Sequence, residues 1–223
     1  MLFRPGEWNQ EAYGAVKDEF RRRGVDELAI PFEVQSRLLL ESTLTPSEVV
    51  LLAAEQLDEG RWSDERGHAI TIVTAALLAN NGVGTIRLEA VSGPTVQAEP
   101  GEMGFDWPAL SLEAQILEYV RHENIEGRVV PIELFRGLDP FCKDGLVARG
   151  LAERTTVKKW KVFSSTHYEV PAATLSLLTD DLIVAVGQLL DVCRRDRAEL
   201  WMLMQVELAE PDREFFALGE GGE

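Results

Sequence analysis

The segment that most constrains the fold is a helix start between Leu44 and Val49. Thr45 stands at the cap position, Pro46 at the first helical position, and Glu48 completes a capping box. The residues that follow are apolar nearly all round the helix, which is typical of a helix buried in the core. The sequence therefore predicts a buried helix that begins at Pro46.

Similar signals predict further helices along the chain. Apolar residues at helical spacing place them over 9–23, 31–41, 66–80, 111–121, 178–194 and 196–208, with short ones after Pro131 and Asp139. Asp139 is interpreted as an N-cap before Pro140, and Asp180-Asp181 as a helix cap. We therefore expect most of the chain to be helical.

Two segments predict β-structure. Residues 85–91 alternate as a strand, and residues 151–170 indicate a β-hairpin with Ser164-Ser165 at its turn. Residues 92–108, rich in Gly, Pro and acids, are predicted to be a loop.

The predicted fold class is mostly α. A single helical domain over 44–208 carries a projecting β-hairpin and a short additional strand element. It follows an N-terminal helical extension, 1–43, and precedes an acidic tail, 209–223.

The net charge limits the choice of partner. Twenty-two Lys and Arg residues stand against 38 Asp and Glu, which gives −16 over 223 residues. Such a chain repels nucleic acid and anionic membranes at long range, and only a local basic patch reverses this. Nucleic acid is therefore an unlikely partner from the sequence.

Cysteine usage and the apolar runs indicate a cytoplasmic protein. Cys142 and Cys193 form no CxxC motif, which fits a reducing compartment. The N-terminal residues carry no signal-peptide pattern, and no apolar run reaches the length of a membrane span. We therefore expect a cytoplasmic protein, with peripheral membrane contact as an option.

The sequence carries no catalytic motif. His68, His122 and His167 lie far apart and match no metal-ligand spacing, and no GxSxG or P-loop pattern occurs. We predict no enzyme activity, no cofactor and no metal site.

The predicted hairpin is the most basic local stretch of this acidic chain. Its candidate contact residues for a membrane or a partner are Lys158, Lys159, Trp160, Lys161 and Phe163. Three interpretations stay open: a solvated two-stranded flap, a membrane-touching hairpin with lysines at lipid phosphates, and the wing of a winged-helix domain. Its exposed edges also predict pairing with a second copy, which would give a homo-oligomer.

The winged-helix interpretation rests on the order of elements over 111–170. Its recognition helix, however, carries Asp139 and Asp144 against Lys143 and Arg149. Balanced charge is poorly suited to DNA phosphates.

Two ordered stretches carry a family resemblance. The first comprises residues 44–53, Asp58-Glu59-Gly60, Ala79-Asn80-Asn81-Gly82 and Ile86-Arg87-Leu88-Glu89; the second comprises Gly145 to Leu151, residues 158–163 and Ser165-Thr166-His167-Tyr168. With a later helix at 197–206, they resemble the GPP34 family of Golgi phosphoprotein 3-like proteins.

The resemblance implies a mostly helical domain with a projecting hairpin and a non-catalytic adaptor role. Eukaryotic members bind phosphatidylinositol 4-phosphate through a Trp, an Arg nine residues later, and an R-x-x-R pair. Carried over, these positions are Trp62, Thr71 in place of the first Arg, Arg136, and Asp139 in place of the last Arg. The resemblance thus implies Trp62 and Arg136 as residues that bind a lipid headgroup.

Three functions follow as expectations. The first is a non-enzymatic peripheral adaptor that touches anionic lipid, such as a phosphoinositide headgroup, through the hairpin. The second is an acidic protein-binding module with a basic protein partner, such as an inhibitor, immunity protein or complex subunit. The third and weakest is a winged-helix nucleic-acid binder.

Overall fold

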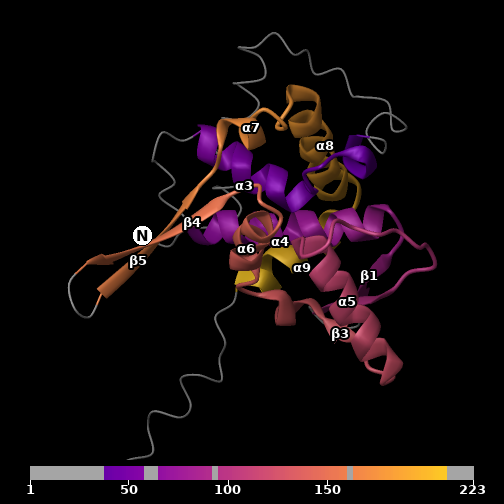
Figure 1. The fold of residues 1–223 in the computed structure, drawn as a ribbon. Coiled ribbons are helices and arrows are strands. Elements are labelled where there is room, and N and C mark those ends of the chain that lie inside the picture. The colour runs from indigo at the N-terminus through magenta and orange to yellow at the C-terminus, as the bar shows by residue number, and fades with distance from the viewer. Residues whose placement is uncertain (1–37, 58–64, 92–94, 160–162, 210–223) are drawn as a thin grey trace, which may run out of the picture.

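The fold is that of a computed structural model, which describes residues 38–57, 65–91, 95–159 and 163–209 (Figure 1). The predicted helix 9–23, most of 31–41 and the tail beyond residue 209 lie outside these ranges. Residues 38–41 are helical.

The described residues are mostly helical, as predicted. The helices are α3 (Pro46–Leu57), α4 (Glu65–Gly82), α5 (Leu112–Ile125), the 3-10 helix η1 (Ile132–Phe135), α6 (Asp139–Ala148), α7 (Ala172–Leu175), α8 (Asp180–Asp196) and α9 (Ala198–Ala209). The strands are β1 (Ile86–Val91), β2 (Thr95–Pro100), β3 (Val130–Pro131), β4 (Glu153–Lys159) and β5 (Phe163–Glu169).

Helix α4 lies at the centre of the helical body. It packs against α3, α5, α6, α8, α9 and β1, and its residues 72–80 are all buried. Small and apolar side chains cover this stretch all round, so neighbouring helices can approach it from every side. Figure 1 shows α4 in the middle of the ribbon, between α3 and α5.

Helix α3 begins as the capping box predicts. The Thr45 backbone N–H donates to Glu48 Oε2 at 2.9 Å, and the Val49 N–H donates to the Thr45 carbonyl at 2.9 Å. Thr45, Ser47 and Glu48 are all buried at this helix start. The polar groups at the start of α3 therefore lie inside the protein and need hydrogen-bond partners within it.

The prediction of a loop over 92–108 is wrong at its centre, because residues 95–100 form strand β2. β2 pairs antiparallel with β1, with Leu88 opposite Ala98, and with the short β3. Val96 and Ala98 point inward and are buried, so β2 has the period-2 burial of a strand. Its Gly- and Pro-rich surroundings concealed this short pattern.

Strands β4 and β5 form a second, two-stranded antiparallel sheet, which extends away from the helices in Figure 1. The prediction that Ser164-Ser165 forms the turn is wrong. These residues lie inside β5, opposite Lys158 and Val157, and the connection runs through residues 160–162, outside the described ranges. The serine pair resembles a turn in composition, but the pairing continues as far as Phe163 opposite Lys159.

Two predicted helix caps are also wrong. Helix α6 begins with Asp139 as its first residue, and Leu138 precedes it in an αR conformation without a side-chain cap. At α8 the Thr179 hydroxyl accepts the Leu182 N–H at 3.3 Å, so Thr179 is the cap. Asp139, Asp180 and Asp181 instead stand in the first turns, where negative charge meets the positive helix end.

Candidate functional site

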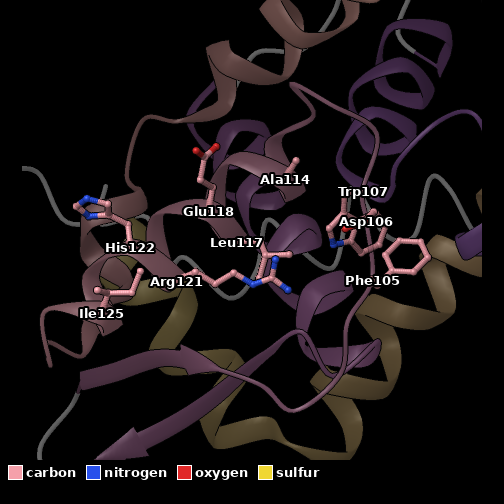
Figure 2. A pocket seen from close by; sticks show the side chains of 9 residues that line it. All are labelled: Phe105, Asp106, Trp107, Ala114, Leu117, Glu118, Arg121, His122 and Ile125. Carbon is pink, nitrogen blue, oxygen red and sulfur yellow. The ribbon is translucent and has the colours of Figure 1, made fainter.

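An open groove runs along one face of α5. Its volume is about 450 Å³, and Figure 2 shows the side chains that line it. From α5 these are Ala114, Leu117, Glu118, Arg121, His122 and Ile125. Their spacing of three and four residues defines one helix face, which we call the α5 stripe. The stripe spans twelve residues, from Ala114 to Ile125, so it is about 16 Å long, or three helical turns.

The segment Phe105–Trp107 forms the opposite wall of the groove. The rings of Phe105 and Trp107 meet edge to face, with centroids 4.7 Å apart. Trp107 is 7% exposed, and its Nε1–H donates to Asn80 Oδ1 at 2.8 Å. The wall is therefore held to the central helix α4 by a buried hydrogen bond.

Asn80 joins α4 to α5 as well as to this wall. Its Nδ2 donates to the carbonyls of Ala76 and Glu113 at 3.0 and 3.1 Å, and its Oδ1 also accepts the Thr85 hydroxyl at 2.8 Å. The sequence alone predicts a helix that ends at residue 80, without a role for Asn80 inside the fold. Asn-Asn-Gly is indeed where α4 ends, and nothing in the local pattern distinguishes a buried Asn from an exposed one.

The α5 stripe carries charges of both signs. Glu118 and Arg121 are exposed, and neither forms an ion pair with another residue in the described part of the chain. The next cation along the chain behaves differently, because Arg128 contacts Glu126 and lies 2.6 Å from Glu123. In Figure 2 the Arg121 side chain extends along the groove toward Leu117. The groove therefore offers an apolar floor with one acid and one cation facing outward.

A cluster of buried polar groups lies where α3, α5 and α6 meet. Glu113 and Glu48 are both fully buried, and the Arg149 guanidinium contacts Glu48. Burial, and then the neighbouring Glu48, raise the pKa of Glu113 to about 7. Burial also raises the pKa of Glu48, although Arg149 acts against this.

The thiol in this cluster is also buried. Cys142 Sγ lies 3.6 Å from the Ser47 hydroxyl, and burial raises its pKa well above the ordinary value. A raised thiol pKa disfavours the nucleophilic thiolate. The cluster therefore has a structural role in joining three helices.

Within the described ranges, no group of three or more His, Cys, Asp or Glu side chains is arranged to hold a metal ion. Across the same residues, no helix is both long and apolar enough to span a membrane.

The hairpin meets the helical body at its base. Arg154 Nη1 and the Tyr168 hydroxyl both contact Asp144 Oδ1 of α6, at 3.3 and 3.1 Å. The Lys143 ammonium lies 5.7 Å from the centre of the Tyr168 ring. Since Arg154 and Tyr168 are directly opposite each other, these contacts fix one end of the two-stranded sheet.

The predicted contact residues lie toward the other end of the hairpin. Lys158 and Lys159 end β4, and Phe163 begins β5. Trp160 and Lys161 lie outside the described residues. Lys159 is five residues beyond Arg154, so it lies about 16 Å farther from the anchored end.

Arg136, the second residue implied by the resemblance, lies between η1 and α6. Its side chain is 19% exposed; Nε donates to the Glu207 carbonyl near the end of α9, and Nη2 lies 3.6 Å from Glu133. Trp62, its expected companion, lies outside the described ranges, and Thr71 is a half-buried residue of α4. Arg136 therefore has contacts within the fold, to the Glu207 carbonyl and to Glu133.

The cations near α6 also have partners within the fold. Lys143 stacks on Tyr168, and Arg149 turns inward to Glu48. In the winged-helix interpretation α6 is the recognition helix. While its cations are engaged in these contacts, its acids Asp144 and Asp139 are exposed and half-buried, respectively.

Comparison with known proteins gives no match, since no family model, curated protein or solved structure matches this chain significantly. The resemblance to the GPP34 family therefore stays a prediction from the motifs quoted above.

Proposed function

We propose that this chain is a non-enzymatic peripheral binding protein whose hairpin, residues 153–169, contacts an anionic lipid surface. The observation that carries the proposal is the anchoring of the hairpin at one end. Arg154 and Tyr168 hold its base to Asp144, while Lys158 and Lys159 lie toward its outer end. An isolated two-stranded sheet is marginally stable in water, so a contact surface at its free end would stabilise it.

Charge is distributed unevenly along the hairpin. Glu153 and Glu169 stand opposite each other at its base. Lys158 and Lys159 end β4 in the outer part, Lys161 follows them in the sequence, and the other lysines of the chain are Lys17 and Lys143. The hairpin is thus acidic near the body and basic at its outer end.

This distribution reconciles anion binding with a net charge of −16. Electrostatic interactions are screened over about 10 Å at 0.1 M salt. Lys159 lies about 16 Å beyond the anchored residues, so the hairpin can meet a charged surface while the acidic body stays beyond the screening distance.

The three hairpin lysines set the expected contribution of the hairpin to membrane affinity. Each cation near an anionic membrane contributes about 1 kcal/mol, so three lysines correspond to roughly a hundredfold in affinity. Apolar contact by Trp160 and Phe163 would add to this attraction and would depend less on salt.

The test is flotation of the full chain with vesicles at about 0.1 M salt. Neutral vesicles are compared with vesicles containing phosphatidylserine or phosphatidylinositol 4-phosphate at matched surface charge. We expect binding to both anionic vesicles, and a loss of about a hundredfold in Lys158/Lys159/Lys161→Ala.

A matched control removes three cations from the body instead. Arg87 of β1, Arg128 of the loop after α5 and Arg195 of α8 are exposed and ion-paired, so Arg87/Arg128/Arg195→Ala changes the net charge equally. Equal losses in the two variants would contradict a site on the hairpin. Absence of binding to every vesicle would overturn the lipid proposal and favour the basic protein partner.

The vesicle comparison also separates general charge from headgroup recognition. A preference for phosphatidylinositol 4-phosphate over phosphatidylserine at equal charge, lost in Trp62→Ala, would support the pocket that the resemblance implies. Equal binding to the two kinds of anionic vesicle would indicate that the hairpin lysines form the whole binding site.

A further inference from the structure

We propose that the α5 stripe is a homodimer interface, in which two copies of this chain pack their α5 helices antiparallel about a twofold axis. This inference is independent of the lipid proposal. It starts from a helix face beside the wall formed by Phe105 and Trp107, on which four of the six stripe residues are exposed, namely Glu118, Arg121, His122 and Ile125.

The stripe is complementary to itself in the antiparallel orientation. With the twofold axis between Glu118 and Arg121, Glu118 of one copy faces the partner's Arg121, and Arg121 faces the partner's Glu118. Leu117 then faces the partner's His122, and Ala114 faces the partner's Ile125. Such reciprocal pairing is what a twofold interface requires.

The central charges support this occupant over an unrelated helix. Glu118 and Arg121 are neighbours at i, i+3 on one helix, yet they form no ion pair with each other or with other described residues. In the dimer Glu118 and Arg121 would each gain one partner of opposite sign, so the ion pair would form twice across the interface. A parallel pairing would instead place like charges together, so the charges also select the orientation.

The two ends of the stripe, Ala114 and Ile125, are complementary in size. Ile125 is 86% exposed, the largest exposure among the exposed large hydrophobic residues of the described ranges. Its position meets the partner's Ala114, whose small side chain leaves room for it. Dimerisation would therefore cover an apolar side chain at each end of the interface.

The wall of the groove sets how the second helix would lie. Trp107 is held by Asn80, and Phe105 packs edge to face on it. These rings bound the stripe on one side, so the partner helix would settle against them. One three-turn helix face is small for a protein interface, so we expect a concentration-dependent dimer at about micromolar concentrations or above.

Charge reversal tests the pairing directly in the full chain. Glu118→Arg places Arg opposite Arg, and Arg121→Glu places Glu opposite Glu, so each single variant should weaken the dimer at least tenfold. The double variant E118R/R121E restores opposite charges and should restore the dimer. Sedimentation equilibrium measures the dissociation constant, and circular dichroism at each concentration confirms that the variants are folded.

Glu102→Arg serves as the control, because Glu102 is an exposed acid outside the stripe. It should leave the dissociation constant within about twofold of the wild type. Three results would overturn the proposal: a wild-type chain that stays monomeric up to about 100 µM, a dimer insensitive to both single variants, or a folded double variant that does not recover. A dimer insensitive to both would point to pairing along the hairpin edge instead.

Discussion

Glu113 of α5 accepts two hydrogen bonds from Ser47 of α3. The Ser47 N–H donates to Oε1 at 2.8 Å and its hydroxyl donates to Oε2 at 3.0 Å. A side chain of one helix thus accepts a buried backbone N–H at the start of another helix, 66 residues away, where no helical partner exists. Glu48 lies nearby and contacts the guanidinium of Arg149, and its negative charge helps to raise the pKa of Glu113.

This arrangement predicts that stability falls as pH rises toward neutrality. The pKa of Glu113 in the folded chain is about 7, above its ordinary value of 4.5, so folding favours the protonated form. The stabilisation is fully present below pH 4.5 and is lost as pH rises through 7, by an amount on the order of 3 kcal/mol. Thermal unfolding between pH 5 and 8 measures it.

Glu113→Gln should flatten this dependence. A glutamine side chain can accept the Ser47 N–H and donate to the Ser47 hydroxyl, which lies 3.3 Å from Thr45 Oγ1 and can turn toward it. Glu102→Gln, a change at an exposed acid outside the α5 stripe, should keep the wild-type slope. Equal slopes in the wild type and Glu113→Gln would contradict the assignment.

Loss of Arg149 should destabilise the fold strongly. Arg149→Met leaves Glu48 buried without its cation, and removing one partner of a buried ion pair typically costs about 3–5 kcal/mol. The double variant Glu48→Gln/Arg149→Met removes both charges and should recover most of that loss. Urea denaturation of the two variants measures the difference, and an equal cost in both would argue against a charge effect.

Asn80→Ala should weaken both the core and the groove. It leaves the Trp107 Nε1–H without its acceptor and removes the side-chain donor to the Glu113 carbonyl, whereas the Thr85 hydroxyl keeps the Asn80 backbone carbonyl. The expected cost is about 2–3 kcal/mol in unfolding free energy. Asn124→Ala on the exposed end of α5 should change stability by less than about 0.5 kcal/mol. Comparable losses in the two variants would contradict the role given to Asn80.

Two glycines in helices should respond in opposite directions to alanine. A Cβ on Gly145 would lie 2.4 Å from the Leu110 carbonyl oxygen, so Gly145→Ala must displace the backbone where it meets α6. A Cβ on Gly187 in α8 meets nothing within 4 Å, so Gly187→Ala should stabilise by about 0.5–1 kcal/mol. Melting temperatures of the two variants should therefore move to opposite sides of the wild type.

The elements that were predictable are those whose signal is local. The capping box at Thr45 and Glu48 defines the start of α3 because its hydrogen bonds lie within four residues. Strand β1 and the helices α4, α5, α8 and α9 follow from apolar spacing, and their ends differ from the predicted ones by a few residues at most.

What could not be predicted depends on contacts between distant residues. β2 exists because Val96 and Ala98 pair with β1, and Asn80 is buried because Trp107 and Glu113 approach it. The α5 stripe was missed because helical spacing alone does not say which face the rest of the fold covers. The hairpin lysines could be identified in the sequence, whereas the contact between the base of the hairpin and Asp144 could be identified only in the structure.

The most direct test of the central claim compares lipid binding by the wild type and the lysine variant. The bound fraction on phosphatidylserine vesicles is measured at about 0.1 M salt for the wild type, Lys158/Lys159/Lys161→Ala and Arg87/Arg128/Arg195→Ala. Only the lysine variant should lose binding, by about a hundredfold in affinity. Binding that is absent in the wild type, or that falls equally in both variants, would contradict it.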